Sequence, residues 1–158
     1  MKSVLLFTIL LLLVAVLFLG THALAAPDFS GTWVFNVSKS KNIGMMSSMQ
    51  ITLKIKQTAS ELVVSELSKY NGQEYTRELH YDLSGKSVSN TGPMGDANDT
   101  ISKWTRSTLE TIWTQDGAVA GSKVSRTETR SLSNDGKTMN DEFVRGFNSA
   151  MVLVFDKQ

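Results

Sequence analysis

Charged side chains occupy one face of residues 124–132, where the alternation of a β-strand would normally place apolar ones. Side chains two positions apart share a face of a strand, so Arg126, Glu128 and Arg130 stand together between apolar residues at the two ends. Guanidinium groups bind carboxylates and phosphates through paired hydrogen bonds. This face therefore has the residue types needed to hold an anionic group.

Residues 75–83 carry a similar face, because Arg77 alternates in step with Tyr81 and with other large apolar side chains. Burying a guanidinium group is costly unless it is paired and hydrogen-bonded. Two arrangements remain open for these arginines. In the first, both faces point into a barrel and line a cavity for an anionic amphiphile, with one Glu as partner. In the second and simpler one, the arginines point outward near a sheet edge, where charges discourage edge-to-edge pairing.

The three tryptophans bear on the same question. Trp supplies much of the apolar area available to a small β-domain, so we expect Trp33 in the core. Trp104 and Trp113 suit either the core or the wall of a ligand pocket. The predicted ligand-binding residues are Arg77, Tyr81, Trp104, Trp113, Arg126 and Arg130.

Residues suited to catalysis are scarce. The chain has no Cys, which excludes thiol nucleophiles, disulfides and Cys-ligated metals. His80 is the only His after residue 25, and its place between Glu78 and Asp82 on the polar face predicts a solvent-exposed side chain. The sequence contains no nucleophile-elbow or phosphate-loop motif. We expect no enzyme activity, no cofactor and no metal site.

The first 25 residues differ in composition from the rest and predict a secretory signal peptide. Lys2 precedes an apolar stretch, residues 4–19, and a small-residue site that ends at Ala25. We expect cleavage after Ala25 or Ala26, with an uncleaved membrane anchor as the alternative. The mature domain, residues 26–158, is then exported to the periplasm or the extracellular space without a transmembrane segment.

The charge of the mature domain is balanced. The whole chain has 16 Lys plus Arg and 15 Asp plus Glu, and removal of Lys2 leaves 15 of each sign. A neutral domain lacks the basic patch of a nucleic-acid-binding protein, so we expect no DNA or RNA partner. We expect the domain to be a monomer.

Period-2 alternation of apolar and polar residues recurs after Pro27 between turn-forming residues and predicts short β-strands. Residues 90–99 contain two Gly and one Pro and are expected to form a loop. Residues 39–48 are expected to form a loop because Gly44 interrupts them, with a short helical lid as the alternative. The pattern fits one domain, an antiparallel sandwich or a closed barrel. We expect about nine or ten strands, in residues 33–37, 51–56, 62–67, 75–83, 87–89, 100–106, 109–114, 124–132, 139–144 and 151–155.

The phrase Asp28-Phe29-Ser30-Gly31-Thr32-Trp33 opens the first strand and resembles the Gly-x-Trp opening of the lipocalin and calycin superfamily. The Lys-Ser-Lys segment at residues 39–41 and the strand-NDGK-strand phrase at residues 132–137 are similar to those of small exported bacterial lipocalin-like proteins. The resemblance spans nearly all of residues 26–158. It implies an all-β fold, a lipocalin-like antiparallel up-and-down barrel of about 8 to 10 strands, with Trp33 at the closed end and a small apolar ligand at the mouth.

Two features depart from that family. A Thr-Asp-Tyr phrase is missing from the second half, and the Arg expected to stack on Trp33 has no unique candidate, Arg145 being the nearest. The chain is also short for a full lipocalin, which indicates a pared-down or partly open barrel. We expect an exported, non-catalytic protein that binds a small apolar or anionic, lipid-like amphiphile. The alternative is a packed β-domain that acts as a cell-envelope structural or protein-interaction module.

Overall fold

The structure is a computed structural model that describes residues 26–92, 95–144 and 149–158. The predicted signal peptide, residues 1–25, lies outside the described residues. Two short 3₁₀ helices are present in the described part, η1 (Val37–Lys39) and η2 (Gly44–Ser48). Ten strands accompany them: β1 (Gly31–Phe35), β2 (Gln50–Gln57), β3 (Glu61–Tyr70), β4 (Gln73–Asp82), β5 (Ser87–Thr91), β6 (Ala97–Thr105), β7 (Thr108–Asp116), β8 (Lys123–Leu132), β9 (Thr138–Val144) and β10 (Met151–Lys157).

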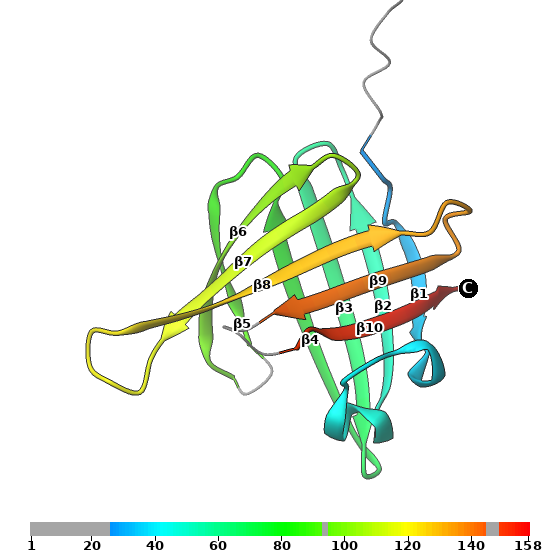
Figure 1. Cartoon of the computed structure of the whole chain (residues 1–158), viewed down its shortest axis with the longest axis horizontal. Coiled ribbons are helices and arrows are strands. Elements are labelled where there is room, and N and C mark those ends of the chain that lie inside the picture. The colour runs from blue at the N-terminus through cyan, green and yellow to red at the C-terminus, as the bar shows by residue number, and fades with distance from the viewer. Residues whose placement is uncertain (1–25, 93–94, 145–148) are drawn as a thin grey trace, which may run out of the picture.

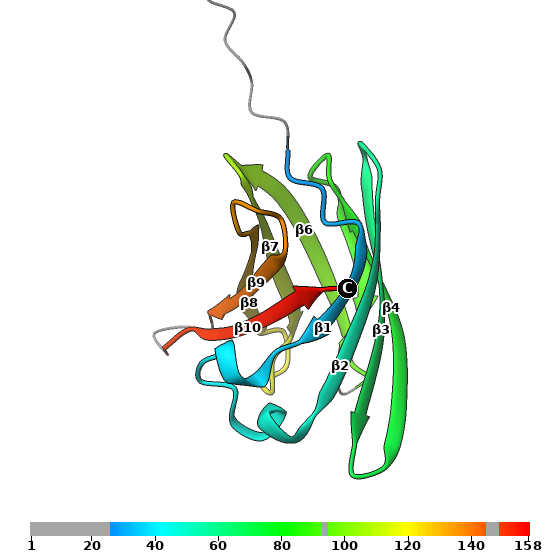
Figure 2. The same cartoon turned by 90° about the vertical axis from the view of Figure 1, so that its right-hand side faces the viewer.

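The strands form one antiparallel sheet that curls into a nearly closed barrel (Figure 1 and Figure 2). The order of neighbours is β4-β3-β2-β1-β10-β9-β8-β7-β6-β5, so strands that follow one another in the chain are neighbours in the sheet, except for β4 and β5, which are its two end strands. β1 and β10, the first and last strands of the domain, pair with each other, so the two halves of the sheet are joined. The all-β, antiparallel up-and-down barrel predicted from the sequence is confirmed.

A side chain joins the two end strands of the sheet. The backbone N–H of His80 on β4 donates to Asn90 Oδ1 on β5 at 2.8 Å, and Asn90 Nδ2 donates to the carbonyl oxygen of His80 at 2.7 Å. The amide group of Asn90 therefore satisfies the main-chain donor and acceptor that a paired strand would otherwise satisfy. The barrel is closed here by one buried side chain rather than by a ladder of main-chain bonds.

The loop predicted over residues 90–99 is strand at both of its ends. β5 continues to Thr91 and β6 begins at Ala97, with Asn90 directly opposite Asn98. Both Asn side chains are buried and donate hydrogen bonds within this part of the barrel. Turn-forming residues can continue a strand where their side-chain amides are satisfied inside the fold. The loop prediction was therefore wrong at both ends of this segment.

The loop predicted over residues 39–48 contains helical turns. In η2, the N–H of Met46 donates to the carbonyl of Ile43 and the N–H of Met49 to that of Met46, each at 3.0 Å. A 3₁₀ turn needs only i to i+3 bonds, so a segment that starts at Gly44 can form one. The side chains of Ile43, Met46 and Met49 pack against the core. Within the part of the chain that the structure describes, no helix has the length and apolar character to cross a membrane.

Trp33 lies at the centre of the apolar core, as predicted, and is fully buried. Its Nε1 donates to the carbonyl of Phe29 at 2.8 Å. The ammonium group of Lys157, on β10, lies 5.1 Å from the centroid of the Trp33 ring. Arg145, the residue expected to stack on this ring, lies outside the described residues, and the cation that the structure places there is Lys157.

Candidate functional site: the barrel interior

The buried side chains of the barrel are almost all apolar on one wall and include many polar ones on the other. The apolar wall comes from β1, β2, β3 and β10 and consists of Trp33, Phe35, Ile51, Leu53, Ile55, Leu62, Val64, Leu153 and Phe155. The polar wall comes from β5 to β9 and includes the buried side chains of Asn90, Asn98, Thr100, Ser102, Thr111, Glu128, Arg130 and Asp141.

Glu128, Arg130 and Asp141, hereafter the interior ion cluster, lie on the polar wall with side chains at most 4% exposed. Arg130 Nε and Nη2 donate to the two carboxylate oxygens of Asp141 at 2.7 and 2.9 Å. Nη2 also donates to Glu128 Oε1 at 2.6 Å. Glu128 Oε2 accepts a hydrogen bond from Trp113 Nε1 at 2.6 Å. One guanidinium group is thus shared by two buried carboxylates.

Sheet register brings these side chains together. Arg130 lies directly opposite Asp141 on β9, and Arg126 lies directly opposite Trp113 on β7. Residues directly opposite on antiparallel strands share a face, so both arginines point into the barrel. The simpler, outward arrangement is therefore wrong for this strand. β8 lies inside the sheet between β7 and β9, and carboxylates of β8 and β9 neutralise the charge of Arg130.

The cluster shifts the proton affinity of its own members. Burial alone would lower the pKa of Arg130, but the carboxylates of Asp141 and Glu128 raise it well above its ordinary value. Burial raises the pKa of Glu128, and Asp141 adds to that rise, while Arg130 and the indole of Trp113 oppose it. Arg130 therefore stays charged. Glu128 is a carboxyl group whose proton affinity responds to any further charge in the interior.

Arg126 is the cation next to this cluster. It is half-buried, and its guanidinium carbon lies 4.7 Å from the centroid of the Trp113 ring. Its Nε is buried without a hydrogen-bond partner, and no salt bridge joins it to another residue in the described ranges. Burial lowers the pKa of Arg126, with Glu128 acting to raise it and Arg77 to lower it. Arginine remains protonated through such shifts, so Arg126 presents a positive charge to the interior.

Arg77 and Tyr81 approach the same region from β4. Arg77 lies directly opposite Glu66, and its Nη2 and Nε donate to Glu66 Oε2 at 2.7 and 3.0 Å, while Nη1 is buried without a partner. The buried Tyr81 ring lies 5.4 Å from the Arg130 guanidinium carbon and edge-on to Trp113 at 5.9 Å. Burial raises the pKa of Tyr81, so its phenol is neutral. The structure therefore brings together five of the six predicted ligand residues: Arg77, Tyr81, Trp113, Arg126 and Arg130.

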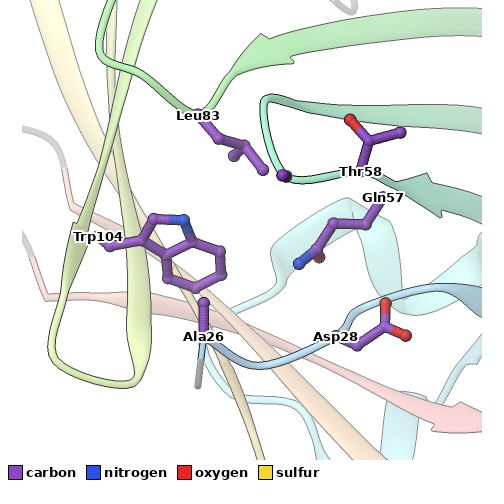
Figure 3. Close-up of a pocket in the computed structure, with 7 residues that line it drawn as sticks. Ala26, Asp28, Gln57, Thr58, Leu83 and Trp104 are labelled. Carbon is purple, nitrogen blue, oxygen red and sulfur yellow. The ribbon is translucent and has the colours of Figure 1, made fainter. Parts of the chain in front are cut away.

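Trp104 lies apart from the other five. It is four residues along β6 from Thr100, the residue opposite Trp113, a separation of about 13 Å along a strand. Its ring stacks parallel to Phe29 with 5.9 Å between centroids. Figure 3 shows it at the edge of an open pocket of about 350 Å³, with Leu83 and Gln57 on the other sides. Trp104 therefore belongs to the end of the barrel near Ala26 and Asp28.

His80 points to solvent, as predicted, on the outside of β4. Its Nδ1 lies 3.0 Å from Glu61 Oε1 and its Nε2 lies 3.1 Å from Glu78 Oε1. The hydrogen bond to Glu61 raises the pKa of His80. A second open pocket, of about 360 Å³, lies between β4 and β5 beside it, and Tyr81 forms part of its lining. The described residues contain no group of three or more His, Asp or Glu placed to hold a metal ion.

Sequence reasoning missed two carboxylates of the interior, Glu66 and Asp141. Each occupies an inward position in an apolar alternation, Glu66 after Leu62 and Val64, and Asp141 after Met139. The arginines were identified because each stands where the alternation of the strand would place an apolar residue. The same observation applies to Glu66 and Asp141. Their partners lie on neighbouring strands, so register was needed to connect them.

The chain matches no protein-family model and no curated protein. It is similar to the REP1-NXSQ fatty acid transporter, with a TM-score of 0.61 and 14% identity over 83% of this chain and 96% of that one. It is similar to human cRBP IV, with a TM-score of 0.62 and 16% identity over 84% and 99% of the two chains. A third similar structure is Caenorhabditis elegans lipid binding protein 8, with a TM-score of 0.59 and 17% identity over 82% and 95%.

Identities this low carry information about the fold, which depends on strand number, order and register rather than on particular side chains. The similar structures are covered almost completely, so the likeness extends over the whole barrel. The lipocalin-like resemblance of the Gly31 to Trp33 motif agrees with it. The chain shares the fold of these structures, a nearly closed antiparallel barrel, here of ten strands.

Proposed function

We propose that this chain is an exported, non-catalytic binding protein for a small anionic amphiphile, which it holds in the barrel interior as a monomer. The observation that carries the proposal is Arg126, a half-buried cation with no salt bridge among the described residues. Its buried Nε has no hydrogen-bond partner. A buried donor without a partner is costly, and an anionic head group would satisfy it.

The two walls support the same ligand class. A hydrocarbon tail gains from contact with the apolar wall of β1, β2, β3 and β10, at roughly 25 cal/mol per Å² removed from water. The polar wall places Arg126 where a head group can meet it. The similar structures include a fatty acid transporter and a lipid binding protein, which favours a lipid-like ligand here. Arg130 also has one buried nitrogen without a partner, Nη1, but Glu128 and Asp141 already neutralise its charge, so the proposal assigns the anionic head group to Arg126.

The first experiment is native mass spectrometry of the protein purified from its own host, followed by organic extraction of anything that co-purifies. A stoichiometric amphiphile supports the proposal and gives the ligand class. A clean apo mass, together with no uptake of fluorescent fatty-acid probes, supports the packed interaction module instead. That second candidate has one observation in its favour, because the two pockets described above open to solvent and neither is lined by the interior ion cluster.

The role of Arg126 is tested with a charge-removing variant and a matched control. Arg126→Met keeps an unbranched apolar stem against Trp113 but removes the cation. We expect it to weaken dodecanoate binding by about 10- to 100-fold, the loss of one charge-assisted hydrogen bond, and to leave dodecanol binding unchanged. Lys54→Met makes the same charge change on an exposed position of β2 and should alter neither affinity. Equal weakening of acid and alcohol by Arg126→Met would contradict the assignment.

Export is tested by the intact mass of the protein recovered from its host. We expect a mature chain that starts at Ala26 or Pro27, since the small-residue site ends there. A recovered chain that retains residues 1–25 would show that the leader acts as an anchor instead.

A further inference from the structure

Among Arg77, Glu66, Arg126 and the interior ion cluster, the charges balance only when Arg126 is counted. Arg77 is matched by Glu66 on the neighbouring strand. The interior ion cluster has one guanidinium group and two carboxylates, all at most 4% exposed, so it carries a net charge of minus one when both acids are ionised. Arg126 supplies the compensating positive charge, and its influence on Glu128 is direct. An interior of low dielectric tolerates a balanced set of charges far better than an unbalanced one.

Trp113 contacts both Arg126 and Glu128. One face of its ring is covered by the Arg126 guanidinium group, and its Nε1 donates to Glu128 Oε2 at 2.6 Å. An anion that binds to Arg126 therefore arrives on the same wall as a buried carboxylate. The bound anion neutralises the positive charge of Arg126, which had balanced the cluster. The interior is then left with one negative charge in excess.

The two acids of the cluster differ in how firmly they are held as carboxylates. Both oxygens of Asp141 accept hydrogen bonds from Arg130, at 2.7 and 2.9 Å. Glu128 receives one bond from Arg130 and one from the neutral indole of Trp113. A neutral donor stabilises a carboxylate less than a guanidinium group does. Glu128 is therefore the acid of the cluster that takes a proton at the smaller cost.

We propose that one anionic amphiphile enters the barrel together with one proton from solvent, which the Glu128 carboxylate takes up. This inference rests on the proposed function, because it assumes that the head group binds at Arg126. No other bond is made or broken, and the interior returns to a balanced charge. Ligand affinity then rises as the pH falls, by up to about tenfold per pH unit while Glu128 is ionised in the free protein and protonated in the complex.

The groups that face Glu128 come from several strands and set its behaviour. Arg130 and Arg126 lie on its own strand, Asp141 on β9, and Tyr81 on β4. Arg77, also on β4, and Asp96, before β6, act electrostatically on Arg126. Burial already raises the pKa of Glu128, and a bound anion raises it further by cancelling the opposing effect of Arg126. Tyr81 stays neutral because burial raises its pKa, so it does not compete for the proton.

The proton is counted by isothermal titration calorimetry with dodecanesulfonate, an amphiphile that has no titratable group of its own between pH 5 and pH 8. The binding enthalpy is measured in buffers of different ionisation enthalpy at several pH values. We expect the wild-type protein to take up close to one proton per ligand within this range. Glu128→Gln should bind with no proton uptake and with an affinity that does not depend on pH. Glu142→Gln, an exposed position on β9, should behave like the wild type.

A second measurement needs no variant at Glu128. Infrared difference spectra of the wild-type protein should show the carbonyl stretch of a protonated carboxyl group appearing when dodecanesulfonate binds, since the ligand contains no carboxyl group. Binding without proton uptake and without this band overturns the inference and leaves the proposed function standing. Proton uptake that persists in Glu128→Gln also overturns it. No binding at any pH, or binding that is indifferent to Arg126→Met, overturns the proposed function itself and this inference with it.

Discussion

At the scale of single residues, the opening motif has two parts with different physical roles. Gly31 has a φ of 135°, a region that side chains rarely adopt, and an added Cβ would lie 2.9 Å from Lys157 Cε. The absence of a side chain lets Lys157 cross over towards Trp33. Trp33 contributes buried apolar area and ties its indole to the carbonyl of Phe29. The motif therefore has a structural role in the core and is not part of the predicted ligand site.

The burial of Trp33 predicts a large loss of stability when it is truncated. Trp33→Ala should lower the free energy of unfolding by about 3 to 5 kcal/mol, because it removes a fully buried aromatic side chain. Urea titration followed by circular dichroism measures this change. Trp104→Ala, at a half-buried position, should lower it by less. An unchanged midpoint for Trp33→Ala would contradict its place in the core.

His80 is expected to titrate above its ordinary range, because the hydrogen bond to Glu61 raises its pKa. The stabilisation from this pair is complete below the pKa of an unfolded His, about 6.5, and is lost as the pH rises through the higher folded pKa. NMR titration of the single His in residues 26–158 measures the value directly. Glu61→Gln should return the pKa towards 6.5, while Glu110→Gln, on β7, should not. A wild-type pKa below 6.5 would show that the contact is absent in solution.

At the scale of elements, the junction of β4 and β5 is the weakest part of the barrel wall. Elsewhere each strand is held by a ladder of main-chain bonds, whereas here the Asn90 amide makes the bridging hydrogen bonds to the backbone of His80. Asn90 Nδ2 also donates to Thr100 Oγ1, which ties the bridge to the β5–β6 hairpin. The second pocket lies over this junction. We therefore expect local opening of the barrel to begin between these two strands.

Asn90→Ala tests that bridge. The substitution leaves the N–H and carbonyl of His80 without their partner and should lower the free energy of unfolding by about 1 to 3 kcal/mol. Amide hydrogen exchange should accelerate most at His80, since the protecting acceptor is lost. Ser87→Ala, at an exposed position on the same strand, serves as the control. Exchange at His80 that is as slow in Asn90→Ala as in the control would show that another group closes the junction.

At the scale of the whole molecule, a ligand that binds only the folded barrel stabilises it by mass action. Dodecanoate at 100 times its dissociation constant should raise the free energy of unfolding by about 2.7 kcal/mol. Thermal unfolding with and without the acid measures the effect as a rise in Tm. Arg126→Met should show a smaller rise at the same concentration, since its affinity is lower. No shift for the wild-type protein would argue for the packed interaction module.

Local alternation was enough to predict most of the strands, because side-chain direction in a strand repeats every two residues and turns need particular residue types. The prediction failed over residues 90–99, where two Asn side chains that usually form turns are buried and satisfied inside the sheet. Over residues 39–48 it favoured a loop over the alternative of a short helical lid, and the helical turns found there depend on packing of Ile43, Met46 and Met49 against the core. Both failures occurred where a contact distant in sequence outweighed a local preference.

The sequence by itself determined the strand pattern and the core position of Trp33, since each depends on spacing along a single segment. The spacing left an antiparallel sandwich and a closed barrel open, and the barrel was implied by the resemblance of the opening motif. It also showed that Arg126 and Arg130 share one face of a strand. Only the tertiary structure decided that this face points inward, because alternation is the same for either direction. The deciding fact is register, which sets Asp141 opposite Arg130 and Trp113 opposite Arg126. Burial of the Arg130 guanidinium group depends on carboxylate partners, and one of them, Asp141, comes from the neighbouring strand, so the pairing exists only once the strands have come together.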